Sequence, residues 1–534
     1  MCSSELPQDL SCVLVYPNSR EVAFASLGFL KVFDMLRRRV RLADLSYMPG
    51  GHGDGRSLPS RARSGGARRA PGQDVLSPRQ GLLLGLATRN QVRDFDVVAF
   101  SVSYENDAIR LPELLIKAGM PALAAARQDL FPLVICGGFA MSINPLPVAD
   151  FVDAVVVGEF EPVVDRLVAT IAEARLAARG RAGAGGGGSA RSDLLRRLAR
   201  LEGVYVPGAG QTAVRRIWAG AEEIAPEPSA EARSHFGDML LVEVGRGCGR
   251  GCLFCAPGHL YRPVRMRRAE TILDQVGSAR VVGLVGTAVG DHPALERLLE
   301  TLVESGRRIG VSSFRADEIT PEIAGMLAEG GVRTLAIAPE AGSEALRRRV
   351  GKDISDQELT DAVGMLAEAG IRIIKLYFMI GLPGESDADA EAIVGLTRRL
   401  AEARGKARLA VAVGPFVPKP HTVFQWSAFA GAETLKRRAA LLGSIRRIRG
   451  CSLKIGSIEE AWLEAVLARA DRSVGSLLLE AAQERIPVGP ILRRAGHLDP
   501  TRALDMEKPL PWDFIKTGVS AKRLRTGFLE FQRG

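Results

Sequence analysis

Along the first 175 residues, short uninterrupted apolar runs alternate with stretches in which apolar residues recur at helical spacing. Strands buried on both faces have such continuous runs, and the helices between them connect parallel strands. We therefore predict an α/β fold for residues 1–175, a doubly wound, Rossmann-like sheet whose ligands lie at the carboxyl ends of the strands. The predicted strands are residues 12–17, 96–102, 132–136 and 154–157, and the predicted helices include 25–38 and 111–118.

Residues 176–235 break this pattern, because they are rich in Gly, Ala and Arg. This composition predicts a flexible linker followed by a bridging segment. The alternation restarts over residues 236–430, and consecutive β/α units there predict a partial (β/α)6 TIM-type barrel with its active site at the C-terminal ends of the strands. The six predicted strands are residues 239–244, 280–285, 307–314, 333–338, 372–380 and 408–416, and the helices between them include 294–304 and 356–369.

The pattern changes again after residue 430. Residues 432–448 and 458–469 have the spacing of amphipathic helices, and strand signals are few. We expect residues 431–534 to form a helical C-terminal region.

Composition adds a question about partners. The chain has 534 residues and a formal net charge of +10, which would suit a polyanionic partner. Much of this charge lies in two stretches, however: residues 55–72 hold five arginines and no acid, and residues 175–200 are also rich in arginine. Because charge runs are usually solvated, a nucleic-acid partner is the weaker alternative.

Cysteine usage indicates a reducing compartment. Three of the seven cysteines cluster tightly and the other four are scattered, which is not the pattern of a disulfide framework. The N-terminus lacks a basic segment followed by an apolar one, and no apolar run approaches the ~20 residues that span a bilayer. We expect a cytoplasmic protein without a membrane partner.

The clustered cysteines, Cys248, Cys252 and Cys255, follow the first predicted strand of the barrel. Thiolates are the ligands that iron–sulfur clusters require, and the glycines around them let the backbone wrap closely around a bulky inorganic core. Nearby Arg246 and Arg250 would help to keep the thiols deprotonated. Three ligands on a four-iron cluster leave one iron open, as a catalytic metal site needs.

A structural zinc ion is the competing interpretation of these cysteines. Zinc usually takes four ligands, and His259 is the nearest fourth candidate. A Cys3His zinc site therefore stays open at this point.

The spacing Cys-x-x-x-Cys-x-x-Cys, with Phe254 before the last cysteine, resembles the signature of the radical S-adenosylmethionine (SAM) superfamily, and residues 238–426 support the likeness. The resemblance implies a [4Fe–4S] cluster whose open iron binds SAM. Reductive cleavage of SAM would then start radical chemistry on an unknown substrate. The chain more narrowly resembles the subgroup with an N-terminal cobalamin-binding-like domain, through residues 101–105, 136–138, 338–344, 376–385 and 415–422.

The same resemblance implies SAM contacts at the strand ends. Gly286 and Thr287 follow the second strand, where relatives often have Gly-Gly-Glu; the acid is missing here, so only a backbone contact with the SAM amino group carries over. Ser312 and Arg315 end the third strand, where Arg315 would pair with the SAM carboxylate. A plain β–α turn and a surface arginine are the alternatives.

Glu340 ends the fourth strand between Pro339 and Ala341, where a carboxylate is costly unless it has a partner. It would accept from the ribose hydroxyls or the SAM ammonium, with a helix N-cap as the alternative. Ile380 and Gly381 would line the adenine, unless they are ordinary strand and turn residues.

Cobalamin is a candidate cofactor of the first domain, with methyl transfer as one candidate reaction. The usual Asp-x-His-x-x-Gly motif is absent, since none of the six histidines has an Asp two positions earlier. A low-potential electron donor of the flavodoxin or ferredoxin type is the expected partner. The alternative function is a non-catalytic, metal-stabilised scaffold or RNA-binding module.

Overall fold

The computed structural model describes residues 8–49, 75–77, 81–180, 187–226 and 238–533, and these form two compact units. Unit 1 contains Met1–Trp218 and Asp471–Ile491, and unit 2 contains Ala219–Ala230, Phe236–Ala470 and Leu492–Gly534. The arginine-rich residues 55–72 and parts of the predicted linker, 181–186 and 227–235, lie outside the described residues.

Unit 1 contains a six-stranded sheet with the order β2-β1-β3-β4-β5-β6. All neighbours are parallel except β6, which pairs antiparallel with β5. This confirms the doubly wound prediction and adds two strands that were not predicted: β2, which has no continuous apolar run, and β6, which lies in the predicted bridging segment. The strands are β1 (Gln8–Tyr16), β2 (Val40–Tyr47), β3 (Val97–Ser101), β4 (Leu133–Gly137), β5 (Ala154–Val156) and β6 (Val204–Tyr205).

The helices of unit 1 include one from far along the chain. Helix α16 (Val474–Glu484) packs against α3 (Leu111–Lys117), although more than 350 residues separate them in sequence. The other helices are α1 (Arg20–Ala25), α2 (Leu27–Arg37), α4 (Phe139–Ile143), α5 (Val164–Gly180) and α6 (Gly187–Leu198).

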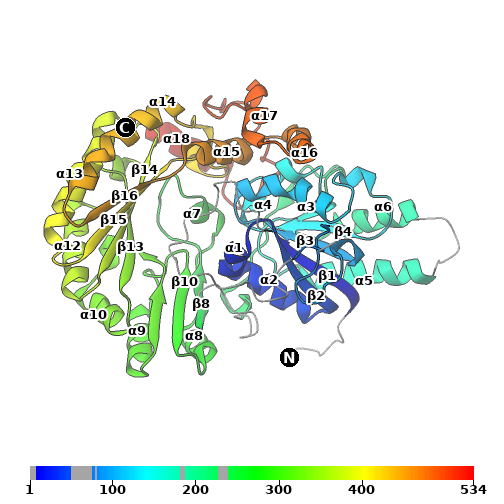
Figure 1. Ribbon diagram of the computed structural model, residues 1–534, viewed down its shortest axis with the longest axis horizontal. Helices are drawn as coiled ribbons and strands as arrows, with labels where there is room; N and C mark the ends of the chain where they lie inside the picture. The colour runs from blue at the N-terminus through cyan, green and yellow to red at the C-terminus, as the bar shows by residue number, and fades with distance from the viewer. Residues whose placement is uncertain (1–7, 50–74, 78–80, 181–186, 227–237, 534) are drawn as a thin grey trace. The chain divides into compact units, whose positions relative to one another are not determined.

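Unit 2 contains a four-stranded and a five-stranded sheet, both curved and mostly parallel, with helices along their convex side (Figure 1). The predicted barrel strands are all present: β8 (Met239–Arg246), β10 (Val281–Gly286), β11 (Arg308–Val311) with β12 (Ser313–Phe314), β13 (Thr334–Glu340), β14 (Ile373–Ile380) and β15 (Arg408–Pro415). A short strand, β9 (Arg265–Met266), pairs antiparallel with the end of β8. The outer helices include α8 (Ala269–Val276), α9 (Leu295–Glu304), α10 (Pro321–Glu329), α12 (Asp356–Glu368) and α13 (Asp387–Ala403).

The barrel sheet continues into the region predicted to be helical. Strand β16 (Cys451–Ile455) pairs parallel with β15, so the prediction of few strands there was incomplete. The predicted helix over 432–448 is α14 (Ala432–Leu441) followed by a 3-10 segment, Leu442–Arg447. The predicted helix 458–469 is α15 (Ile458–Arg469). β16 was missed because its side chains alternate between half-buried and exposed and form no apolar run.

Local signals explain where the barrel helices begin. At α12, the Ser355 hydroxyl accepts a hydrogen bond from the Glu358 amide at 3.1 Å, while the Glu358 carboxylate accepts from the Ser355 amide at 2.7 Å. This reciprocal pair satisfies two backbone donors that a helix start leaves open. The apolar faces of α9, α10, α12 and α13 then pack on the strands to form the main core of unit 2.

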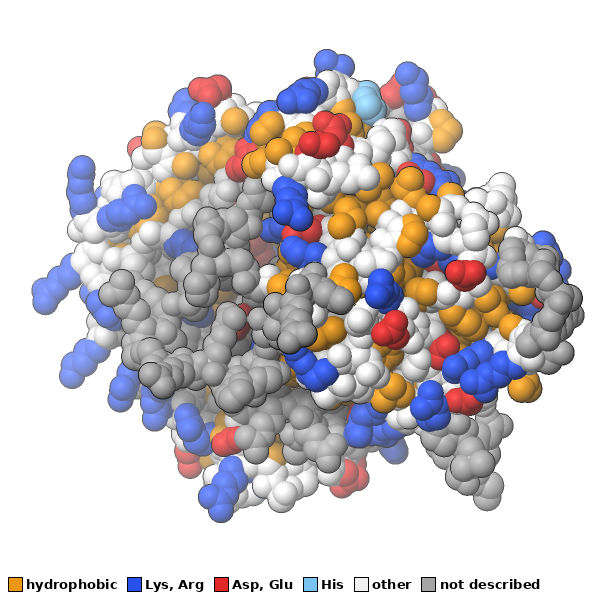
Figure 2. All heavy atoms as spheres, turned by 45° about the vertical axis from the view of Figure 1, so that its right-hand side comes forward, with side chains coloured by type: hydrophobic (Ala, Val, Ile, Leu, Met, Phe, Trp, Pro, Cys, Tyr) orange, Lys and Arg blue, Asp and Glu red, His pale blue; other side chains and the backbone are white. Residues whose placement is uncertain are grey.

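A second apolar cluster lies where the last helix, α18 (Ala521–Arg533), packs. It includes Phe416, Phe424, Trp426, Phe528 and Phe531. None of the described helices is both long and apolar enough to cross a membrane. On the face drawn in Figure 2, Lys and Arg side chains lie in separate groups with acidic side chains among them.

Candidate functional site

The three cysteines lie on the loop that leaves the C-terminal end of β8. Gly247 begins this loop at φ +91°, and a Cβ there would lie 2.2 Å from the Tyr261 carbonyl oxygen, so only glycine fits. Cys255 starts the short helix α7 (Ala256–Leu260), and its sulfur accepts from the Gly258 amide at 3.4 Å. Loop and helix together fix the sulfur-bearing backbone.

The three thiols are free, half-buried and close enough to affect one another. Burial, helped by the charges of Cys252 and Cys248 and opposed by the hydrogen bond from the Gly258 amide, raises the pKa of the Cys255 thiol to about 11. Burial also raises the pKa of Cys252, against the lowering effect of Lys352 and Arg315. Iron would have to displace these protons to bind, as metal ligation by thiols requires.

Three thiols on one loop are a donor set that an iron–sulfur cluster can take. Among the described residues, no three His, Cys, Asp or Glu side chains are placed to hold one metal ion. His259, the candidate fourth zinc ligand, has its Nδ1 2.9 Å from the Cys255 carbonyl oxygen. A cubane spreads its cysteines over several irons, whereas zinc needs each sulfur ~2.3 Å from one point. Gly249 and Gly251 leave open space beside the loop, since a Cβ on either would meet nothing within 4 Å.

The two arginines expected to keep the thiols deprotonated form ion pairs with carboxylates instead. Arg246 donates to Glu243 at 2.8 Å. Arg250 pairs with Asp291 at 2.5 Å and also with Glu318 at 3.3 Å and Asp317 at 3.5 Å. Arg250 thus anchors the loop, and the cations that lower the pKa of Cys252 are Lys352 and Arg315 instead.

The predicted strand-end residues lie at the C-terminal ends of strands in both sheets of unit 2. Gly286 ends β10, Glu340 ends β13 and Ile380 ends β14. The Thr287 hydroxyl accepts from the Gly247 amide at 3.3 Å, which links the second strand to the cysteine loop. Ser312 is exposed at the break between β11 and β12.

Glu340 lies beside the cysteines in a strained backbone conformation. Its φ is +69°, which is uncommon for a residue other than glycine. Burial raises the pKa of its carboxyl group, while Lys352, with its ammonium 3.5 Å from the Glu340 carboxylate, lowers it. The Glu340 charge in turn raises the pKa values of Cys252 and Cys255.

Lys352 is the residue of this site that the sequence analysis missed. Its side chain is buried, and it lies next to a close contact between two loops. The Leu253 amide donates to the Val350 carbonyl at 3.0 Å, and a Cβ on Gly351 would lie only 2.6 Å from the Gly251 carbonyl oxygen. A lysine that follows a short helix normally faces solvent, so nothing in the sequence predicts that Lys352 is buried. The only local signal is Gly351, which indicates a turn at this point.

Arg315 already has partners at these strand ends. Its Nε and Nη2 donate to the two oxygens of Asp317 at 2.9 and 3.0 Å, and Nη2 also reaches the Asp353 carbonyl at 3.3 Å. The guanidinium still lowers the pKa values of Cys252 and Glu340, so it remains part of the charged site.

The remaining predicted residues are packed. Ile380 is fully buried in the barrel core, and Phe254 packs against the second apolar cluster. Gly381 has a φ of +89°, and a Cβ there would lie 2.9 Å from the side chains of Ala430 and Leu435. The Gly381 amide donates to the Glu385 carboxylate at 2.5 Å, which closes the turn after β14.

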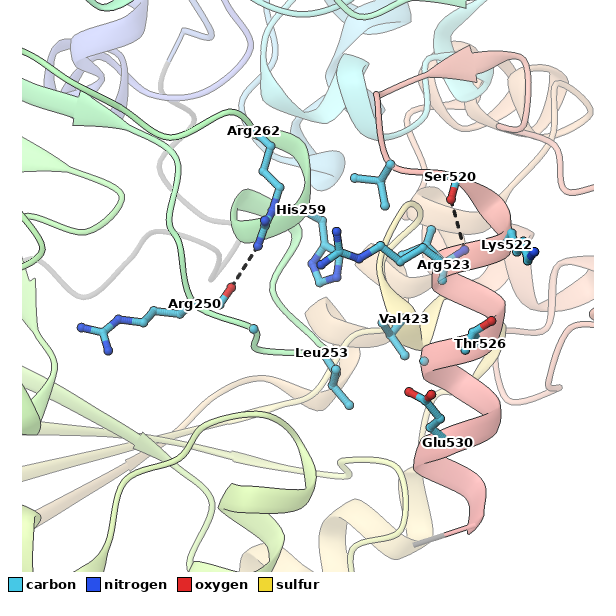
Figure 3. Close-up of a pocket in the computed structure, with 14 residues that line it drawn as sticks. Arg250, Leu253, His259, Arg262, Val423, Ser520, Lys522, Arg523, Thr526 and Glu530 are labelled. Atoms are coloured by element: carbon cyan, nitrogen blue, oxygen red, sulfur yellow. Dashed lines mark hydrogen bonds between the residues drawn. The ribbon is translucent and has the colours of Figure 1, made fainter.

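A cavity of about 450 Å³ adjoins the cysteine loop on the side of α18 (Figure 3). Its walls are Leu253, His259 and Arg262 on one side and Arg523 and neighbouring residues of α18 on the other. Arg523 extends from α18 toward His259 (Figure 3), and together with Arg262 it lowers the pKa of that imidazole, whose largest shift comes from burial.

Comparisons with known proteins decide the family. Residues 70–207 match the family described as radical SAM proteins, N-terminal, and residues 242–397, which contain the cysteine loop, match the Radical SAM superfamily. The chain belongs to the radical SAM superfamily. It is therefore an enzyme rather than a non-catalytic scaffold, and the family implies a [4Fe–4S] cluster and SAM.

Relatives of this radical SAM enzyme cover different shares of it. An uncharacterized protein of Methanocaldococcus jannaschii is 28% identical over 405 residues, 74% of this chain and 82% of that protein. A tRNA-2-methylthio-N(6)-dimethylallyladenosine synthase of Anaeromyxobacter dehalogenans is 27% identical over 291 residues, 50% of this chain and 61% of the synthase. The match thus leaves out more than a third of the synthase.

Two solved structures have a similar fold. The methyltransferase TsrM from Kitasatospora setae, solved with cobalamin and a [4Fe–4S] cluster, has a TM-score of 0.50 at 14% identity, covering 78% of this chain and 73% of TsrM. The cobalamin-dependent enzyme OxsB, with aqua-cobalamin bound, has a TM-score of 0.50 at 16% identity, covering 90% of this chain and 62% of OxsB. At these identities the likeness concerns the fold alone.

Proposed function

We propose that Cys248, Cys252 and Cys255 hold a [4Fe–4S] cluster with one iron open to SAM. The observation that carries this proposal is that three free, half-buried thiols share one loop beside Glu340 and Lys352. Bound there, the cluster supplies the electron that splits SAM into methionine and a 5′-deoxyadenosyl radical. The protein's part is to orient SAM and keep water away from the radical.

Each strand end contributes one contact with SAM. The backbone of Gly286 and Thr287 faces the amino group, and Glu340, paired with Lys352, accepts from the ammonium or the ribose hydroxyls. Ser312 and Arg315 face the carboxylate from the third strand. The backbone of Ile380 and Gly381 borders the adenine, since the Ile380 side chain is buried in the core, and Phe254 holds the loop against the apolar cluster.

Anaerobic reconstitution tests this function. Iron, sulfide and a reductant should give a brown protein with about four irons per chain that forms 5′-deoxyadenosine from SAM, as family membership implies. Replacing the three loop cysteines by alanine should abolish iron binding and product, whereas Cys451→Ser, on β16, should keep both. A colourless wild-type protein that holds stoichiometric zinc would refute the proposal.

Sulfur insertion fits the described cysteines poorly. That reaction usually uses a second cluster, yet Cys12 and Cys136 are buried within β1 and β4, and Cys451 lies on β16. Hydrogen abstraction and methyl transfer are therefore the favoured reaction classes for the unknown substrate.

Cobalamin-assisted methyl transfer is the second candidate, favoured by the strand order of unit 1. That order, β2-β1-β3-β4-β5, belongs to doubly wound sheets that bind a ligand where the order reverses. Without Asp-x-His-x-x-Gly, no histidine of that motif would ligate cobalt. Reconstitution with cobinamide, a corrinoid without a nucleotide base of its own, tests this: a bound Co(II) form should give an electron paramagnetic resonance (EPR) spectrum without nitrogen superhyperfine splitting. Failure to retain corrinoid would exclude the candidate.

The electron donor is proposed to be an acidic carrier of the flavodoxin or ferredoxin type, docking beside α18. Lys522 and Arg523 lie there near the cysteine loop (Figure 3), and positive patches speed encounters with acidic proteins ~10- to 1,000-fold. The test is the rate of 5′-deoxyadenosine formation with flavodoxin relative to photoreduced 5-deazaflavin, a small uncharged reductant. This ratio should fall at least tenfold in K522E/R523E, and an unchanged ratio would refute the docking surface.

A further inference from the structure

The concave face of the barrel sheet is lined by small residues around two lysines and a tyrosine. Along β14, Ile374, Leu376 and Phe378 are buried in the core beneath the helices, so the alternate residues Lys375 and Tyr377 face the other way, into the barrel interior. On β16, Ser452 and Lys454 likewise alternate with Cys451 and Leu453, which pack on the core. We call the face that carries Lys375, Tyr377, Ser452 and Lys454 the lumen face.

The strand register places these side chains on either side of the alanines of β15. In one row across the three strands, Lys375 of β14 pairs with Ala410 of β15, which pairs with Ser452 of β16. Two residues further along the strands, Tyr377 pairs with Ala412, which pairs with Lys454. Neighbouring strands are ~4.8 Å apart, so Tyr377 and Lys454 flank Ala412 across ~10 Å.

The lumen face has room for a ligand. TIM-type barrels usually fill their interior with bulky branched residues. Here the alternate positions of β13 are Ala336 and Ala338, and those of β15 are Ala410, Ala412 and Gly414. Tyr377 accordingly stays 41% exposed, and Lys375 and Lys454 are both exposed. Beside β8, by contrast, the Met239 side chain covers Gly283 and Gly310.

The two lysines carry charge that the described part of the chain does not neutralise. Neither ammonium has a carboxylate partner among the described residues, whereas the acids at the same face are committed: Glu243 holds Arg246, and Glu340 holds Lys352. An uncompensated pair of ammonium groups beside an exposed aromatic ring is complementary to an anion that carries an apolar or planar part.

We propose that the substrate of this enzyme is a small anionic molecule, held through a phosphate or carboxylate group by Lys375 and Lys454 and packed along Tyr377. This inference rests on the proposed function, because it places the substrate on the barrel side of the SAM contacts. Glu340 pairs with Phe378, so Lys375 lies three residues, or ~10 Å, before the level of Glu340 on β14, and Tyr377 lies one residue before it. A substrate of that length places its anionic end at the lysines and its reacting carbon at the cysteine loop.

Equilibrium dialysis of the reconstituted enzyme with three matched probes tests the proposal. Phenyl phosphate and benzoate carry the two anionic groups on the same ring, and benzyl alcohol is the neutral control. At least one of the two anions should bind, and benzyl alcohol should bind at least tenfold more weakly than that anion. The ratio of the two anions' dissociation constants identifies the preferred anionic group. K375M/K454M, which keeps side-chain length, should lose at least tenfold in anion affinity, and K375R/K454R should keep most of it.

Matched measurements separate this result from other failures. K406M removes an exposed lysine before the N-terminal end of β15, at the opposite edge of the barrel, and should bind as wild type does. Circular dichroism and iron content report whether K375M/K454M folds. Equal binding of benzyl alcohol, or unchanged anion binding by K375M/K454M, would overturn the proposal. Dialysis needs no turnover, so absence of SAM cleavage would refute the proposed function without changing this result.

Discussion

The Lys352 ammonium lies 3.5 Å from the Glu340 carboxylate, and Lys352 also lowers the pKa of Cys252. One cation thus serves both the strand end and the cysteine loop. Replacing Lys352 by methionine leaves Glu340 without this partner in a desolvated position, so its pKa should rise further and it should take up a proton. A neutral carboxyl group is a poorer acceptor for the SAM ammonium.

We predict that K352M binds SAM ~10- to 100-fold more weakly, the range expected for one lost charge-assisted hydrogen bond. Anaerobic SAM titration, followed by the change in the EPR spectrum of the reduced cluster, measures this. K352R should restore most of the affinity, and K406M should behave as wild type. Wild-type SAM affinity in K352M with full iron content would contradict the assignment.

Gly351 is the second residue on which the cysteine loop depends. Its φ is +75°, and a Cβ there would lie 2.6 Å from the Gly251 carbonyl oxygen and 3.3 Å from the Cys252 Cα. We predict that G351A shifts the cysteine loop and destabilises the enzyme by about 1–3 kcal/mol, the cost of such backbone strain. Iron per chain after reconstitution and the urea midpoint of unfolding measure the two effects.

Gly364 provides the matched control for that substitution. It lies inside α12, and a Cβ there would meet nothing within 4 Å. G364A should therefore stabilise the protein by about 0.5–1 kcal/mol, since alanine is the better helix former. Equal iron content in G351A and G364A would show that the contact between the two loops does not position the cysteines.

Features that depend on a local pattern could be predicted from the sequence. The barrel strands were found because each has a continuous apolar run, and the cysteine loop was found because its ligands are close in sequence. Strand β16 and the docking of α16 on unit 1 were missed, since both depend on partners far away in the chain. Lys352 was missed for the same reason. Its burial beside Glu340 depends on tertiary contacts, which the residues next to it in sequence do not predict.

Glu385 links the turn after β14 to the rest of unit 2 and should make stability depend on pH. Its carboxylate accepts from the Gly381 amide and from Arg438, each at 2.5 Å. Burial raises its pKa from the usual 4.5 to about 7, with Asp389 adding to the rise and Arg438 opposing it. Between these two values the native state binds more protons than the unfolded state, so the free energy of unfolding falls as pH rises through this window.

We predict that the fall amounts to about 2 kcal/mol, since one pKa unit corresponds to ~1.4 kcal/mol and the site is partly solvated. E385Q cannot titrate and should lack this fall, while E391Q, which alters an exposed glutamate of α13, should keep it. Urea unfolding at pH 5, 6, 7 and 8 gives the difference in unfolding free energy between wild type and E385Q at each pH. As pH rises, wild type should lose stability relative to E385Q. If the difference stays constant, or favours wild type at high pH, Arg438 keeps Glu385 ionised throughout the range.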